Sequence, residues 1–334
     1  MELLILGGTR FLGRALIELA LASGHQITLF HRGKSNPDLF PEALHLIGDR
    51  ETDLSLLAGR HWDAVIDTSA YIPRVARLAA QALTSLTDQY TFISTLSVYA
   101  DSSQIGIDET ASVGKLDDET VEQVDGQTYG PLKALCEQEI LRVFPNNSLI
   151  IRPGLIVGRY DLSDRFTYWP HRLFSGGDVL VPGTPQRKIQ FIDVYDLSAW
   201  ILRLIENGAS GIFNADSPAG MHTMGELMDA CCQLAQSLVQ LTWAADDFLL
   251  SEGVDPWMGL PLWMPENDPT QAGFYAFDIS KARQSGLTYR PLSETVRETL
   301  DWELSRPPHT WRAGISSQRE AELLEKWHCN QDRK

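Results

Sequence analysis

Two side chains in the segment QTYGPLKALCEQ have the types and the spacing needed for proton transfer. Tyr129 and Lys133 stand four residues apart, so a helix through this segment places both on one face. A free phenol ionises with a pKa of about 10, and a neighbouring ammonium group lowers that pKa because it stabilises the phenolate. Pro131 is tolerated only in the first turn of a helix, so we expect the helix to begin close to Tyr129. Other elements must then bring a ligand to this pair.

A second group of residues has the pattern of a phosphate-binding turn. The segment GGTRFLG follows the apolar run ELLIL and leads into a helical pattern, with Arg10 where the expected spacing would place a middle glycine. In such a turn the first glycine allows the tight bend, the last allows close helix-sheet packing, and the helix N-terminus attracts a pyrophosphate. Arginine fits the middle position only if its backbone needs no positive φ. We expect dinucleotide contacts from Gly7, Thr9, Arg10, Phe11, Leu12 and Gly13.

The end of the second predicted strand indicates which dinucleotide binds. Sites that prefer NAD carry an acid here, which accepts a hydrogen bond from the ribose 2′-hydroxyl. In this chain QITLF is followed by His31 and Arg32, and the acid is missing. A guanidinium binds a 2′-phosphate through charge-assisted hydrogen bonds, whereas a carboxylate repels it. Arg10 and Arg32 together therefore favour NADP(H) over NAD.

The elements that must position these residues alternate along the first half of the chain. Apolar runs predict strands at 2–6, 26–30, 43–47, 63–67, 90–95 and 148–152, and helical patterns cover 11–24, 50–59, 74–86 and 127–144. Strands that are apolar on both faces and alternate with helices predict an α/β fold with a doubly wound parallel sheet, a Rossmann fold. We expect the apolar run 189–194 and the helix 196–206 to extend this sheet.

The second half of the chain is less regular and richer in proline, tryptophan and glycine. This predicts a smaller, mixed C-terminal domain that binds the substrate, with a charged terminal helix over 316–328. We place the NADP-binding domain at residues 1–155 plus about 186–207. The substrate-binding domain then covers about 156–185 and 208–334.

Composition argues against several classes of partner. The formal net charge of -16 repels polyanions, so we expect no nucleic-acid partner. The four cysteines show neither zinc-ligand nor disulfide spacing and the histidines are scattered, so no metal is expected. No apolar run reaches membrane-spanning length and no basic leader precedes the first strand. We expect a cytoplasmic monomer or homodimer that acts on a small molecule without membrane contact.

Several blocks together resemble the extended short-chain dehydrogenase/reductase superfamily, in particular its NAD-dependent epimerase/dehydratase family. These blocks are GGTRFLG after the first strand, GDR after the third, FISTLSVYA at the end of the fifth and YGPLK at the next helix, followed by RPGLIVG and QFIDVYDLS. The resemblance implies that Thr95 binds the carbonyl oxygen, Tyr129 is the general acid/base, and Lys133 supports Tyr129 and the nicotinamide ribose. In shorter superfamily members a basic residue at the position of Arg10 marks NADP preference. The resemblance also implies cofactor contacts at Asp49, Arg50, Thr68, Ser69, Ala70, Pro153 and Gly154.

Two departures from the family pattern narrow the expected reaction. Sugar dehydratases of the family carry Asp-Glu directly after the catalytic threonine, where this chain has Leu96 and Ser97. Many nucleotide-sugar epimerases carry Asn at the position of Leu155, and leucine cannot hydrogen-bond a diphosphate. We therefore expect an NADPH-dependent oxidoreductase that reduces a carbonyl or related C=X group of a small organic substrate.

The substrate contacts are the least determined part of the predicted site. The segment GRYDLSDRFTYWPHRLF could bind an anionic or aromatic substrate, but a helix that packs its aromatic side chains into the core explains it equally well. The candidate contacts are Ser97, Arg159, Arg165, Tyr168, Trp169 and Arg172. Two alternatives stay open: a nucleotide-sugar epimerase that retains NAD(P), and a non-catalytic dinucleotide-binding protein similar to plastid relatives associated with RNA.

Overall fold

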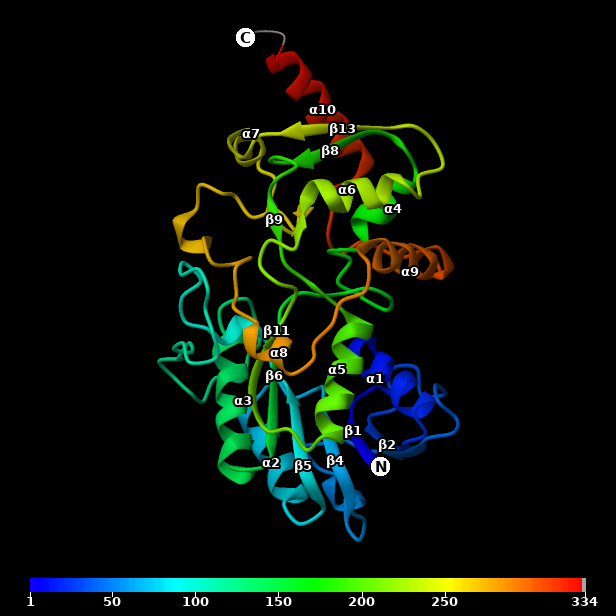
Figure 1. Ribbon diagram of the computed structural model, residues 1–334, viewed down its shortest axis with the longest axis vertical. Coiled ribbons are helices and arrows are strands. Elements are labelled where there is room, and N and C mark those ends of the chain that lie inside the picture. Colours follow the sequence, from blue (N-terminus) through cyan, green and yellow to red (C-terminus); the bar gives the residue numbers. More distant parts are fainter. Residues whose placement is uncertain (332–334) are drawn as a thin grey trace.

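A seven-stranded parallel sheet forms the N-terminal part of the protein, whose computed structural model describes residues 1–331 (Figure 1). The strand order is β11-β6-β5-β4-β1-β2-β3, so the direction of winding reverses between β1 and β4. The predicted doubly wound α/β fold is therefore confirmed. The strands are β1 (Glu2–Leu6), β2 (Gln26–His31), β3 (Leu44–Ile47), β4 (Trp62–Asp67), β5 (Thr87–Ile93), β6 (Ser148–Pro153) and β11 (Gly211–Ala215).

Helices cover both faces of this sheet (Figure 1). Strand β1 packs apolar side chains on both faces of the sheet. Leu3 and Ile5 belong to one core cluster, and Leu4 and Leu6 belong to another. Side chains alternate along a strand, so a strand with two covered faces is apolar throughout. The helices that pack against each other are α1 (Phe11–Ala22) with α5 (Val194–Glu206), and α2 (Pro73–Leu83) with α3 (Tyr129–Val143).

The structure corrects two of the predicted elements. The pattern over 50–59 contains only a short 3-10 turn, η1 (Leu54–Leu57). The run 189–194 does not join the sheet, because Asp193 caps the N-terminus of α5 and the chain turns into that helix. The sheet instead ends with β11, which lies beyond the domain boundary predicted near residue 207 and was not anticipated. The run contributes to two small pairings, β9 (Lys188–Ile189) with β12 (His222–Thr223) and β10 (Ile192–Asp193) with β7 (Ile156–Val157).

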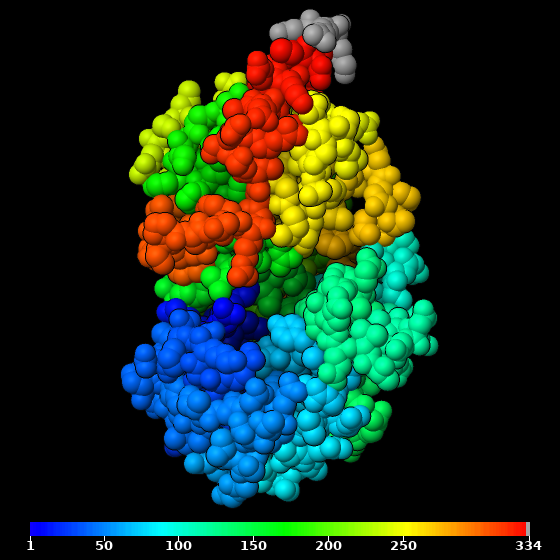
Figure 2. All heavy atoms as spheres, turned by 180° about the vertical axis from the view of Figure 1, so that it is seen from behind, coloured from blue at the N-terminus to red at the C-terminus, as the bar shows by residue number. Residues whose placement is uncertain are grey.

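The rest of the chain forms a smaller region with its own apolar core, which includes Trp169, Leu180, Met228 and Trp263. In Figure 2 the N-terminal residues, in blue and cyan, lie below the C-terminal residues, in orange and red. The domain boundaries themselves stay a prediction. The elements of this region are α4 (Tyr168–Phe174), β8 (Gly177–Pro182), α6 (Met224–Cys232), β13 (Val239–Ala244), α7 (Asp246–Ser251), β14 (Pro256–Trp257), β15 (Leu260–Pro261), η3 (Pro269–Gln271), α8 (Ser280–Gln284), α9 (Leu292–Ser305) and α10 (Ser317–Gln331).

Within residues 1–331, no helix combines the length and the apolar character that crossing a membrane requires.

Candidate functional site

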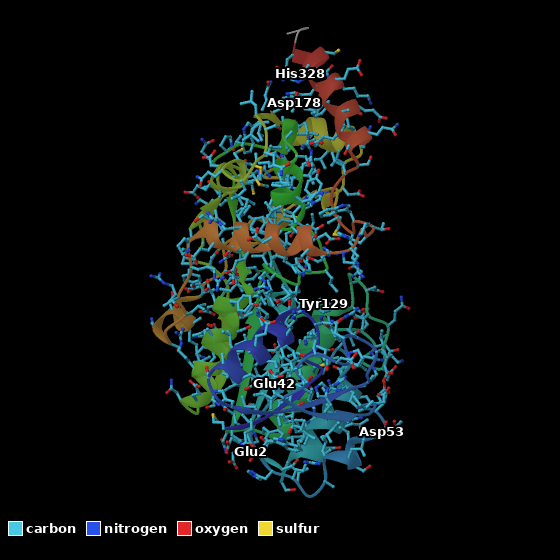
Figure 3. The ribbon with its side chains drawn as sticks, turned by 90° about the vertical axis from the view of Figure 1, so that its right-hand side faces the viewer. Glu2, Glu42, Asp53, Tyr129, Asp178 and His328 are labelled. Carbon is cyan, nitrogen blue, oxygen red and sulfur yellow. The ribbon has the colours of Figure 1, made fainter. Side chains whose placement is uncertain are left out.

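The carboxyl ends of the parallel strands open onto a cavity of about 1000 Å³. Open α/β sheets bind ligands at this edge, next to the point where the winding direction reverses. Figure 3 shows Tyr129 at the level where the sheet meets the C-terminal region. The predicted residues that line the cavity are Gly7, Thr9, Arg10, Phe11, Leu12, Gly13, Arg32, Asp49, Arg50, Thr68, Ser69, Thr95, Ser97, Tyr129, Lys133, Pro153, Gly154 and Arg165.

The remaining predicted residues have other surroundings. Tyr168 and Trp169 are buried in the core of the C-terminal region, where the Trp169 indole donates to the Pro261 carbonyl. Arg172 pairs with Glu320, Nε to Oε2 at 2.6 Å, and Arg159 lies against the Tyr160 ring. Because none of these four residues lines the cavity, Arg159, Tyr168, Trp169 and Arg172 are removed from the predicted substrate contacts. Ala70, predicted to contact the cofactor, is likewise buried outside the cavity wall.

The turn after β1 has the geometry of a phosphate cradle. Gly7 and Gly8 adopt φ values of 93° and 94°, which favour glycine. Arg10 precedes α1 with a φ of -136°, so its backbone is extended, as an arginine at this position requires. No side chain caps the helix there, so its first N–H groups remain available to an anion.

Gly13 is needed because α1 passes directly over the turn. A Cβ at Gly13 would lie 2.5 Å from the Gly8 Cα, and the obstacle is backbone. Gly13→Ala is therefore expected to lower the free energy of unfolding by about 1–3 kcal/mol and to weaken dinucleotide binding. Urea unfolding and cofactor titration measure the two effects. Gly126→Ala is the matched control, because a Cβ there meets nothing within 4 Å. Unchanged stability and binding in Gly13→Ala would contradict this account of the turn.

Three cations line the cavity close to the ends of β1 and β2. Arg10 and Arg32 are exposed and line the wall together with Lys34, which the sequence analysis did not single out. Over residues 1–331, none of the three forms an ion pair. A dianionic phosphate therefore finds positive charge here that no protein carboxylate neutralises.

His31 occupies the position of the missing acid. Its Nδ1 accepts from the Gly33 N–H at 3.1 Å, so the neutral ring carries its proton on Nε2, which faces Nδ1 of His45 at 2.9 Å. Burial and the neighbouring His45 lower the pKa of His31 below its ordinary value. At neutral pH, His31 is therefore an uncharged group that shapes the turn carrying Arg32.

Arg50 lines the cavity, and its guanidinium forms an ion pair with a carboxylate of the protein. Its guanidinium binds Asp67 through two hydrogen bonds of 2.8 and 2.6 Å, and Tyr90 donates to the same carboxylate. Arg50 holds the pKa of Asp67 below its usual value although burial opposes this. Arg50 thus supports the cavity wall through an ion pair, and its contact with the cofactor stays a prediction, as does that of the neighbouring Asp49 on the same wall.

Thr95, Tyr129 and Lys133 meet at the other end of the cavity. Thr95 follows β5, Tyr129 is the first residue of α3, and Lys133 lies one turn further along that helix. Burial, and to a smaller extent Tyr71, raise the pKa of Tyr129 to about 12, although the Thr95 hydroxyl and Arg165 oppose this shift. The expected lowering by Lys133 is absent, so this part of the prediction is corrected.

The environment of Lys133 explains the correction. Its Nζ donates to the carbonyls of Ala70 at 2.9 Å and Ile93 at 2.6 Å, which leaves one of its three N–H donors for a ligand. Burial lowers the pKa of Lys133 to about 8. The ammonium is thus fixed on backbone oxygens.

Sequence reasoning missed several residues of the cavity wall. Asp216 directly follows the unpredicted strand β11, and burial raises its pKa well above the usual value. A Cβ on Gly154 would lie 1.8 Å from the Asp216 carboxylate, so only glycine fits opposite this acid. Trp257 and Tyr275 reach the cavity from a region predicted only as loops. The apolar run GIFNA before Asp216 was the one local signal available.

The residues present fit a dinucleotide. The glycine cradle, the available N–H groups of α1 and the three cations suit the phosphates, and the cavity continues to Tyr129. Among residues 1–331, no group of three or more His, Cys, Asp or Glu side chains is arranged to hold a metal ion.

Comparisons with known proteins agree with this geometry. The model of the NAD dependent epimerase/dehydratase family matches residues 3–215. The chloroplast stem-loop binding protein of 41 kDa b of Arabidopsis thaliana is 29% identical over 257 residues, which cover 70% of this chain and 62% of that relative. The match thus spans less than two thirds of that relative. An epimerase family protein of Bos taurus is 26% identical over 249 residues, covering 69% of this chain and 79% of that protein.

Solved structures share the fold. The UDP-glucuronic acid 4-epimerase of Bacillus cereus, solved in complex with NAD, superimposes with a TM-score of 0.65 at 17% identity, covering 92% of this chain and 100% of that one. At this identity the similarity is one of fold alone. The plant relative is named for stem-loop binding, so the expectation that nucleic acid is no partner is not supported.

Proposed function

Because the chain belongs to the NAD dependent epimerase/dehydratase family, we propose that it is an NADPH-dependent oxidoreductase that reduces a carbonyl group of a small organic substrate. One observation carries the proposal: a single cavity holds Thr95, Tyr129 and Lys133 at one end and the unpaired Arg10 and Arg32 at the other. The first group suits proton transfer to a carbonyl oxygen, and the second suits a 2′-phosphate.

Each residue then has a definite task. Bound NADPH would supply the hydride. The Thr95 hydroxyl would donate a hydrogen bond to the carbonyl oxygen, and Tyr129 would transfer its phenolic proton to the same oxygen. The raised pKa of Tyr129 supports this direction, because the phenol holds its proton at neutral pH until the developing alkoxide takes it. Because the pKa of Tyr129 is raised, the phenolate left behind regains a proton from solvent at neutral pH.

The test begins with the cofactor content of the purified protein and continues with NADPH oxidation. We expect protein without stoichiometric NAD(P) that oxidises NADPH when supplied with members of a panel of aldehydes, ketones and 2-oxo acids. Stoichiometric retained NAD(P), with no net cofactor turnover on any compound of the panel, would instead favour the epimerase alternative.

The plant relative supports a second candidate, a protein that binds RNA. The formal net charge of -16 opposes this unless a local basic surface attracts the phosphates. Titration of the protein with an RNA stem-loop at near-physiological salt separates the candidates. Tight RNA binding by protein that reduces no carbonyl compound would replace the oxidoreductase proposal.

Lys133 predicts how NADPH binding depends on pH. Its pKa of about 8 means that the ammonium is present below this pH and is lost above it. If its remaining N–H holds the nicotinamide ribose, the Kd for NADPH rises only about twofold between pH 7 and 8, and the rise approaches tenfold per pH unit well above pH 8. Fluorescence titrations between pH 7 and 9.5 measure this. Lys133→Met is expected to bind NADPH more weakly and to remove the inflection, and a flat wild-type profile would contradict the assignment.

A further inference from the structure

Arg165 is a charged side chain of the cavity for which the proposed reaction has no role. It lies in the loop between β7 and α4, and its guanidinium is half-buried. Over residues 1–331, its side chain makes one hydrogen bond, from Nε to the Ser163 hydroxyl at 3.2 Å, and no ion pair. A guanidinium carries five N–H donors, so most of them lack a protein partner.

Several other arginines withdrawn from solvent pair with carboxylates, although over residues 1–331 the half-buried Arg159 of the same loop forms no ion pair either. Arg152 binds Glu137, and Arg306 binds both Asp164 and Glu303. Buried charges are stabilised when they are paired or hydrogen-bonded, and Arg165, unlike Arg159, faces the cavity with most of its N–H donors unpartnered. An outside anion would complete its pairing.

Asp161 attracts Arg165 through space and is linked to it through the Ser163 hydroxyl, without a direct ion pair. Its carboxylate accepts from the Ser163 backbone N–H and hydroxyl, each at 2.8 Å, and it forms no ion pair with the guanidinium. Burial lowers the pKa of Arg165 below its ordinary value although Asp161 opposes the shift.

The surroundings of Arg165 form a composite surface. Its guanidinium lies 5.0 Å from the centre of the Trp257 ring, which is itself held edge-on by Phe274. Arg165 also lies close enough to Tyr129 for each group to alter the pKa of the other. A cation, an indole wall and the proton donor thus line the same part of the cavity.

We propose that the carbonyl substrate carries a carboxylate that binds Arg165, while the apolar part of the molecule lies against Trp257. A guanidinium and a carboxylate match in a bidentate pair. The inference rests on the proposed function where it names the ligand a substrate, but the anion subsite is testable by binding alone.

In the experiment, carboxylates and their neutral amides are titrated into the full chain in the presence of saturating NADP⁺. The pairs are benzoate with benzamide, phenylacetate with phenylacetamide, and cyclohexanecarboxylate with its amide. We expect at least one carboxylate to bind about 10- to 100-fold more tightly than its amide in calorimetry. Arg165→Gln should remove the preference and Arg165→Lys should restore part of it. Arg159→Gln, which removes a charge from the same loop away from the cavity wall, should leave it unchanged.

A second measurement needs no variant and so does not depend on variant folding. Phenylglyoxal modifies accessible arginines, and peptide mass spectrometry locates the product. The preferred carboxylate should protect Arg165 and leave Arg159 reactive. The inference is overturned if no pair shows a carboxylate preference, if Arg165→Gln keeps that preference, or if the carboxylate gives no protection. Carboxylate binding without NADPH oxidation on any carbonyl compound would overturn the proposed function and leave the anion subsite intact.

Discussion

Tyr129→Phe is expected to lower kcat by about 10²- to 10⁴-fold, the contribution typical of a positioned general acid. Phenylalanine keeps the ring at the start of α3 and removes only the hydroxyl that would protonate the carbonyl oxygen. The measurement is NADPH oxidation with the carbonyl compound that the wild-type protein reduces fastest. The Kd for NADPH should change by less than about threefold, because the hydroxyl acts on the reacting oxygen.

Tyr71→Phe is the matched control for this variant. Tyr71 also lines the cavity, and its ring centre lies 6.2 Å from that of Tyr129. The Tyr71→Phe variant also loses a phenolic hydroxyl, but at a neighbouring position. A fall in kcat of similar size in this variant would show that the effect is not specific to Tyr129. A Tyr129→Phe variant as fast as the wild type would refute the proposed proton transfer.

Arg10→Gly combined with Arg32→Asp is expected to shift the ratio of the NADPH and NADH dissociation constants about 10²- to 10⁴-fold toward NADH. Each arginine lost removes a hydrogen bond to a charged group, worth about 1.5–3 kcal/mol, and the new aspartate repels the 2′-phosphate. The two constants are measured by fluorescence titration, which needs no knowledge of the substrate. NADH binding should weaken little, since NADH carries no 2′-phosphate.

The control for the double variant is Arg283→Asp with Arg297→Gln. Both residues are exposed and lie outside the cavity wall, and the pair changes the net charge by the same amount. If the control shifts the ratio as much, the long-range field of the protein explains the selectivity. If neither variant shifts it, Arg10 and Arg32 do not contact the phosphate.

Much of the fold was readable from the sequence because its determinants are local. Strand β1 is apolar from Leu3 to Leu6, and it lies between two strands with both faces covered. The glycines of GGTRFLG were readable for the same reason, since tight turns and close packing limit the residue type at one position. The prediction that residues 189–194 join the sheet was wrong, because a short apolar segment does not reveal its partner strand. Asp193 caps α5, so the chain turns into that helix.

For the polar residues of the site, too, local features were predictable from the sequence and long-range contacts were not. The spacing of Tyr129 and Lys133 on one helix is local and was readable from the sequence, whereas their expected roles came from the resemblance to the family. The sequence could not indicate that Arg50 is neutralised by Asp67 while Arg165 is left unpaired, since both are arginines near a predicted ligand. The partners of a charged side chain come from elements far apart in the chain.

The amino-acid sequence by itself determined the alternating elements, the dinucleotide turn and the spacing of the proton-transfer pair. Each depends on backbone conformation and side-chain periodicity within a few residues. The tertiary structure decided which charges remain free, placed Asp216 opposite Gly154, and brought Trp257 to Arg165. Those outcomes depend on packing and desolvation between distant segments, and a linear pattern does not encode them position by position.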